Sequence, residues 1–176
     1  MKFLKDLKAV LLFYVVIIIL GLSSCDKSAI SELDMPDTDP TTTPFRGSSE
    51  RTQLLEVYNL NYSKWKSRSI SNYKIVEKIK CGECVGYGGL PHQLTVVNNA
   101  TRSIKDEKGV AIPKDNTPFR TIEGLFKFTE TSLKKEFAGA SIKYNAQYGY
   151  PESVYFDFNA EFIDEEMGYA VIKFSK

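Results

Sequence analysis

Two stretches of helical periodicity, each followed by strand-like alternation, constrain the fold of residues 49–176 more than any other feature. In residues 49–68, apolar side chains recur every three or four positions, which predicts a helix with one apolar face: Leu54, Val57, Tyr58, Tyr62 and Trp65. In residues 73–81, YKIVEKIKC, apolar side chains alternate with lysines. A period of two predicts a strand that buries one of its sides.

The rest of this region repeats the succession. Residues 92–97 and 101–106 predict a hairpin around Asn98-Asn99, because asparagine tolerates the positive φ of a tight turn. Residues 107–120 are predicted to be loop. A second helix is predicted from Thr121 to a stop at Gly139, and three strands are predicted in the ranges 141–146, 152–159 and 168–175.

The order αβββαβββ predicts an α+β fold, with an antiparallel sheet and two helices on one face. Since both halves have the same plan, it also raises the hypothesis of an internal duplication.

The N-terminal segment is typical of a secretory signal peptide. Residues 1–8, MKFLKDLK, form a basic leader, and residues 9–22 are 14 positions without a charge. A helix of that length is too short to cross a hydrocarbon core of about 30 Å. A basic leader and a short apolar segment before small residues predict a signal peptide over residues 1–24. A retained anchor helix is the alternative.

The end of this segment, Leu22-Ser23-Ser24-Cys25, resembles the lipobox of bacterial lipoproteins. In that motif the cysteine thiol takes a diacylglyceryl group, and cleavage leaves the cysteine as the first residue. The resemblance implies that Cys25 is lipidated and that the protein meets a membrane through its N-terminal lipid. It places the protein in the bacterial cell envelope, with its domain outside the cytoplasm.

Residues 25–48 link the anchor to the domain. They carry Pro36, Pro40 and Pro44 among Asp, Thr and Ser, and such a composition buries too little apolar surface to offset its ordering entropy. We therefore predict a flexible linker over this range and a single domain over residues 49–176.

The charge balance argues against a nucleic-acid partner. Without residues 1–24, 20 basic side chains face 21 acidic ones. A nucleic-acid-binding domain usually carries a clear basic excess along one stripe, which this sequence does not show.

Cys81-Gly-Glu-Cys84 is the pattern that most suggests chemistry. A Cys-x-x-Cys pair is redox-active when its first thiol lies at a helix N-terminus, where the dipole lowers the pKa. Here the pair follows a strand and leads into a Gly-rich loop. A structural disulfide between Cys81 and Cys84 is the favoured interpretation; a redox centre and free thiols stay open.

Other polar groups predict turns or surface rather than a site. His92 has no Ser or Cys nucleophile in a recognisable setting, and we interpret it as a polar edge residue at a strand start. The acidic cluster 157–166 lacks the Gly and Glu of a calcium loop at its sixth and twelfth positions, and GYGG at 86–89 lacks the lysine of a phosphate-binding loop. The sequence predicts no metal and no cofactor.

Four tyrosines gather near one predicted hairpin: Tyr144, Tyr148, Tyr150 and Tyr155. Tyrosine is frequent at interfaces but also in strands. The group is interpreted either as a contact surface or as core.

Three segments, TIEGLF (121–126), KYNAQYGYPESVYFD (143–157) and IDEEMGYAV (163–171), resemble a domain-of-unknown-function family of exported bacterial proteins, many of them lipoproteins. Its pattern is a Trp-containing first helix, an Asn-Tyr strand, a close cysteine pair, a TI-x-x-LF helix, a GYP hairpin and a terminal acidic-to-Tyr strand. The matching residues are Trp65, Asn72-Tyr73, Cys81 with Cys84, Ile122, Gly149-Tyr150-Pro151 and Asp164 to Tyr169. The chain departs from the pattern by separating its cysteines by two residues instead of one. The resemblance implies an exported α+β module and no activity.

Two functions follow as hypotheses. The first is a non-catalytic binding module tethered to the envelope, whose ligand is an envelope protein or polymer. The second is an envelope thiol-disulfide enzyme that uses Cys81 and Cys84. The reduction potential of the pair discriminates between them, since a structural bond resists reduction.

Overall fold

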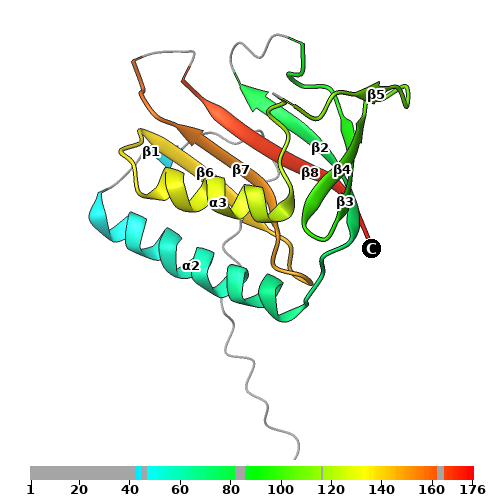
Figure 1. The fold of residues 1–176 in the computed structure, drawn as a ribbon. Helices are drawn as coiled ribbons and strands as arrows, with labels where there is room; N and C mark the ends of the chain where they lie inside the picture. The colour runs from blue at the N-terminus through cyan, green and yellow to red at the C-terminus, as the bar shows by residue number, and fades with distance from the viewer. Residues whose placement is uncertain (1–42, 45–46, 82–85, 116, 162–164) are drawn as a thin grey trace, which may run out of the picture. The chain divides into compact units, whose positions relative to one another are not determined.

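The computed structural model describes residues 43–44, 47–81, 86–115, 117–161 and 165–176. All the strands in these ranges join one antiparallel sheet in the order β1-β6-β7-β8-β2-β3-β4-β5 (Figure 1). The predicted α+β class is confirmed. In chain order the elements are β1 (Thr43–Pro44), α2 (Ser48–Ser67), β2 (Tyr73–Cys81), β3 (His92–Val97), β4 (Ala100–Lys105), β5 (Ala111–Ile112), α3 (Ile122–Leu133), β6 (Gly139–Tyr144), β7 (Pro151–Asp157) and β8 (Met167–Ser175).

The sheet buries the side chains of one of its two faces, which we call the inner face. In β2, Tyr73, Ile75 and Ile79 are buried while Lys74 between them is exposed, as the alternation predicts. The buried strand residues that make up the inner face are Tyr73, Ile75, Glu77, Ile79, His92, Leu94, Val96, Ile104, Ile142, Val154, Phe156, Tyr169 and Val171.

Helix α3 packs against this inner face. Thr121 caps it, since its hydroxyl accepts a hydrogen bond from the Gly124 backbone N–H at 3.1 Å. The ring of Phe128 lies edge-on to the ring of Tyr169, with centroids 5.1 Å apart. The helix ends at Leu133, before the predicted stop at Gly139. Phe137, in the loop that follows, is buried.

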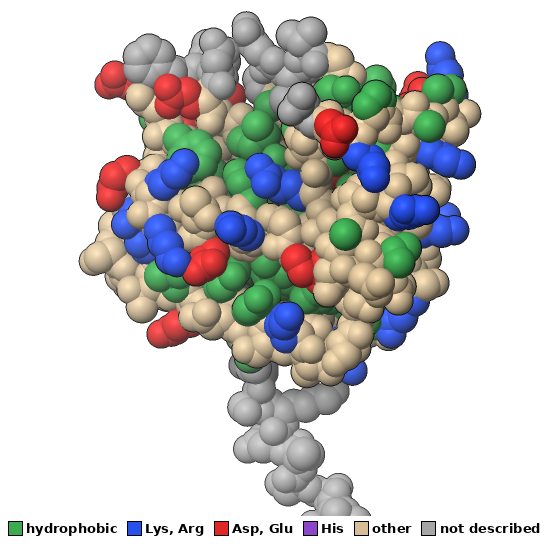
Figure 2. Space-filling view, in the orientation of Figure 1, with side chains coloured by type: hydrophobic (Ala, Val, Ile, Leu, Met, Phe, Trp, Pro, Cys, Tyr) green, Lys and Arg blue, Asp and Glu red, His purple; other side chains and the backbone are tan. Residues whose placement is uncertain are grey.

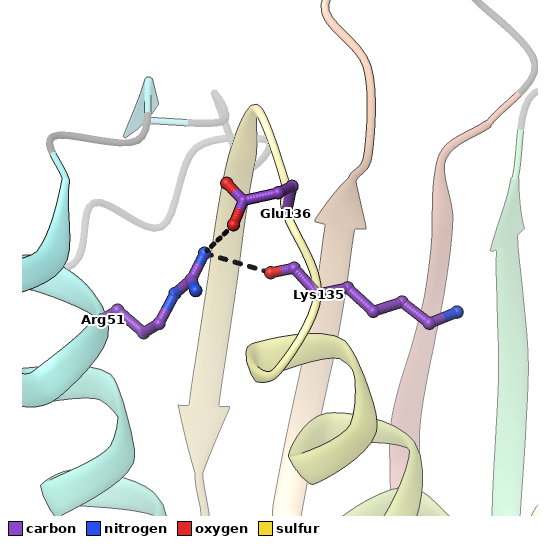
Figure 3. A network of polar contacts seen from close by, with 3 residues as sticks. All are labelled: Arg51, Lys135 and Glu136. Atoms are coloured by element: carbon purple, nitrogen blue, oxygen red, sulfur yellow. Dashed lines mark hydrogen bonds and ion pairs between the residues drawn. The ribbon is translucent and has the colours of Figure 1, made fainter.

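Helix α2 packs on α3 and on the end of the sheet. Tyr58 and Trp65 are buried, but Val57 is 44% exposed, so the apolar face is narrower than the spacing predicted. At its first turn Arg51 donates to the backbone oxygen of Lys135 at 3.0 Å and lies 3.4 Å from the Glu136 carboxylate (Figure 3). This contact fixes the start of α2 to the loop between α3 and β6.

Glycine is required where the β6–β7 hairpin meets α2. Gly149 has a φ of 82°, and a Cβ there would lie 2.6 Å from the backbone oxygen of Asn61. The next residue, Tyr150, is buried against Trp65, with ring centroids 6.1 Å apart. The GYP sequence therefore lets the hairpin seat directly on the helix.

Two short strands lie where the sequence predicted irregular chain. Thr43–Pro44, within the predicted linker, pairs with β6, and Ala111–Ile112, within the predicted loop, pairs with β4. Neither is long enough to show alternation, and each is held by backbone hydrogen bonds that leave no trace in side-chain pattern. A two-residue edge strand also accepts Pro44 without loss of an interior ladder.

We predict that β1 stabilises the domain although it precedes the predicted boundary at residue 49. A chain that begins at Asp39 should melt at the same temperature as one that begins at Asp26. A chain that begins at Phe45 loses the β1–β6 hydrogen bonds, at about 1 kcal/mol each, and its Tm should fall by about 5 °C. Thermal melts followed by circular dichroism test this, and equal melting temperatures for all three chains would contradict it.

Candidate functional site

A carboxylate is buried at the centre of the inner face. Glu77 is fully buried; its Oε2 accepts a hydrogen bond from the Arg120 backbone N–H at 3.1 Å, while its Oε1 has no partner among the described residues. Burial raises the pKa of Glu77 to about 8, against the opposing effects of the Arg120 backbone N–H and charge. The group therefore binds a proton near neutral pH.

Two further polar side chains, those of Arg120 and His92, lie near this carboxylate. The Arg120 guanidinium lies 5.1 Å from the ring centroids of both Phe128 and Tyr169, which is a cation–π distance. His92 pairs with Glu77 across β2 and β3. The prediction of His92 as a polar edge residue is wrong, because it is buried in an interior strand and its Nδ1 lies 3.0 Å from the Leu90 backbone oxygen.

This cluster has the composition of an active site but not its accessibility. Glu77 has no exposed surface and His92 is almost fully buried, so neither can contact a substrate in the described conformation. Sequence reasoning missed both residues, although the signal was present. Position 77 is in phase with Ile75 and Ile79, and position 92 with Leu94 and Val96, which places a Glu and a His on the buried side.

Glu77 should make the stability of the protein depend on pH. Its pKa is raised from 4.5 to about 8 by folding, so the folded state binds more protons than the unfolded state between these values, and stability falls as pH rises through this window. Glu77→Gln should remove that fall and make the variant more stable than the parent at pH 8. Urea denaturation across this window measures it, with exposed Glu56→Gln as control. Parallel pH profiles for the parent and Glu77→Gln would contradict the prediction.

The opposite face of the sheet, which we call the outer face, carries lysines. Its residues alternate with those of the inner face along each strand, and neighbouring strands place them in register: Val76 pairs with both Lys173 and Gln93, and Gln93 with Lys105. The lysines of the outer face are Lys74, Lys78, Lys80, Lys105, Lys143 and Lys173.

Most of these lysines lack an acidic partner. Lys143 lies 3.9 Å from Glu152, and within the described ranges none of the other five forms an ion pair. By contrast, acidic and basic side chains are interspersed on the face seen in Figure 2. Five of the six lysines of the outer face thus have no acidic partner among the described residues.

The outer face holds a shallow depression where β2, β3 and β8 meet. It has a volume of about 180 Å³ and is lined by Lys74, Ile75, Val76, Gln93, Lys173 and Ser175. Two ammonium groups, an amide and a hydroxyl supply hydrogen-bond donors, and none of the lining side chains is a carboxylate. An anion fits this lining better than a cation.

The four tyrosines do not form one surface. Tyr150 is buried in the core, and the Tyr144 ring stacks on Phe126 of α3 at 6.3 Å. Tyr148 stacks on Tyr150 and lies beneath the Lys176 ammonium group. Tyr155 lies on the outer face, where a Cβ on Gly168 would come within 2.9 Å of its ring.

The cysteines are only partly described. Cys81 is the last residue of β2, half-buried beside the core, while Cys84 and the proposed lipidation site Cys25 lie outside the described residues. The disulfide and the lipid anchor stay predictions. Among the described residues no group of three or more His, Cys, Asp or Glu side chains could hold a metal ion, and no described helix is long and apolar enough to span a membrane.

The comparison with known families concerns residues 57–176, which match the model of the family of unknown function DUF6174. The chain belongs to this family. The DUF6174 region contains most of α2, all of α3 and every strand except β1. No curated protein and no solved structure matches the chain.

Proposed function

We propose that this DUF6174 protein is a non-catalytic binding module of the bacterial cell envelope, tethered to a membrane through Cys25, and that it binds through the outer face of its sheet. The observation that carries the proposal is the set of lysines on that face without acidic partners. Charge that is not compensated within a protein is available to a partner.

The position of the helices supports the choice of this face. Trp65 of α2 packs edge-on against Tyr73, and Phe128 of α3 against Tyr169; both partners lie on the inner face. We infer that both helices cover the inner face and leave the outer face to a ligand. The sheet edges are less suitable, because β1 and β5 are two-residue strands that blunt them.

The tether allows the domain to reach a membrane. The 17 residues between Cys25 and Thr43 span at most about 60 Å when fully extended, which is greater than the diameter of a small domain. A lipid at Cys25 would hold the outer face within reach of the membrane or of neighbouring envelope components.

The alternative, a thiol-disulfide enzyme, receives less support from the geometry. Cys81 is the last residue of a strand, whereas the thiol of a redox-active pair is activated at a helix N-terminus. We propose a structural disulfide with Cys84.

The binding surface can be tested by site-specific photo-cross-linking in living cells. A photoreactive amino acid at Gln93 on the outer face should give covalent adducts in the envelope several-fold above one at Leu60, which is 71% exposed on α2. Both positions are accessible, so the difference reports binding rather than exposure. The absence of any adduct at Gln93, or equal yields at both positions, would refute binding through this face.

Lipidation predicts a separate outcome. Cys25→Ser should leave an unprocessed precursor that takes up no labelled palmitate, because the acceptor thiol is gone. Cys81→Ser serves as the control and should remain labelled. Palmitate incorporation that persists in Cys25→Ser would contradict the anchor.

A further inference from the structure

We propose that the outer face docks on an anionic lipid surface and that the depression between β2, β3 and β8 takes the phosphate of a lipid headgroup. This inference rests on the proposed function and names the partner of the same face.

The fold gathers positive charge on one face, although the sequence as a whole is nearly neutral. The part of the chain after residue 24 is nearly neutral, yet the outer face gathers six lysines. Strand β2 shows how this arises: Lys74, Lys78 and Lys80 point outward, while its one acidic residue, Glu77, is buried on the inner side. An outward carboxylate at that strand position would have paired with the lysines and cancelled the field.

The depression is suited to a single oxyanion. Lys74 and Lys173 flank it, and Gln93 and Ser175 add uncharged donors. Ammonium, amide and hydroxyl groups all donate to phosphate oxygens, and the charged donors give the stronger bonds. A volume of about 180 Å³ holds a phosphate group but not an extended peptide.

The extent of the face favours a membrane over an acidic protein segment. The lysines lie on four of the six neighbouring strands from β6 to β4, and at about 4.8 Å between strands these six make a surface more than 20 Å across rather than a cleft. Ile172, at the β-bulge beside Lys173, is 56% exposed. An apolar side chain beside lysines suits the boundary between headgroups and acyl chains.

Electrostatic attraction sets the expected strength of membrane binding. A lysine near an anionic membrane surface contributes about 1 kcal/mol, and the attraction falls off within a Debye length. Binding should therefore be salt-dependent and depend on several lysines together. The N-terminal tether keeps the face close to the membrane and raises its effective concentration there.

The test uses the full chain with a photoreactive amino acid at Val97, an exposed outer-face residue of β3 that does not line the depression, purified from membranes and reconstituted into vesicles. Phospholipid adducts are quantified in phosphatidylcholine vesicles and in vesicles containing about one third phosphatidylglycerol. We expect adducts to rise about tenfold in the anionic vesicles and to fall again at high salt. Adducts that are equal in both vesicles would overturn the inference.

Matched variants separate the outer face from general charge. A triple variant of the outer face should lose the increase: Lys74→Gln, Lys78→Gln and Lys173→Gln. A triple variant on the helices should retain it: Lys66→Gln in α2, Lys127→Gln in α3 and Lys134→Gln directly after α3. Equal losses in both triple variants would show a non-specific charge effect and overturn the inference. Adducts to the chain's own residues alone, with none to lipid, would also overturn it.

The failure of this inference is distinguishable from that of the proposed function. Protein adducts at Gln93 in cells, without lipid adducts in anionic vesicles, would overturn the lipid surface and retain a binding module with an acidic protein partner. No adduct of any kind in cells would overturn both.

Discussion

The carboxylate of Glu123 holds the two helices and the sheet in one arrangement. The Trp65 indole N–H of α2 donates to its Oε1 at 3.0 Å, and the Tyr73 hydroxyl of β2 donates to its Oε2 at 2.8 Å. That hydroxyl also accepts from the Ile122 backbone N–H at 2.8 Å, which satisfies one of the free donors at the start of α3. Burial and the adjacent carboxylate raise the pKa of Tyr73, so the phenol remains a donor. The Trp-containing helix, the Asn-Tyr strand and the TI-x-x-LF helix of this chain thus meet at one polar contact.

The two faces of the sheet differ in where charged groups lie: the inner face buries them, and the outer face exposes them to solvent. The inner face buries Glu77 and covers Arg120 with aromatic rings, an arrangement that disfavours the ionised carboxylate and costs stability at neutral pH. The outer face leaves lysines in solvent. A polar residue in place of Glu77 would keep the fold, whereas a carboxylate moved to the outer face would change the surface potential. Burial of Glu77 therefore keeps a carboxylate away from the lysines of β2 on the outer face.

The periodicity of apolar residues predicted the long elements that bury a regular set of side chains, and it missed the two short strands β1 and β5. The alternation in YKIVEKIKC and the capped repeat after Thr121 gave β2 and α3 because each buries a regular set of side chains. Strands β1 and β5 are two residues long, too short to show a period, even though Ile112 of β5 packs against the core. The inward Glu77 and His92 were missed because polar residues were read as exposed. The lysines form one surface only because the strand order brings β6, β8, β2 and β4 into one sheet.

The hypothesis of an internal duplication meets a geometric obstacle. Strands β6-β7-β8 and β2-β3-β4 follow in the same left-to-right order, but antiparallel pairing makes β2 run opposite to β6. A rotation that superposes the triplets would turn the sheet over and place α2 and α3 on opposite faces. The two helices contact each other instead: the Tyr62 ring of α2 lies 5.0 Å from that of Phe126 of α3. The halves share an order of elements without sharing a three-dimensional unit.

The pairing of β2 with β8 bears on how the chain becomes folded in the cell. These strands form the centre of the sheet, yet Cys81 pairs with Met167 and Lys74 with Ser175, almost the full length of the domain apart. Contacts of such sequence separation form slowly, because a long loop must close first. Residues 167–175 must leave the ribosome before the centre of the sheet can form, so the part of the domain made earlier cannot complete the fold. For the export that we propose, this delay is useful, because the domain stays unfolded until β8 has been made.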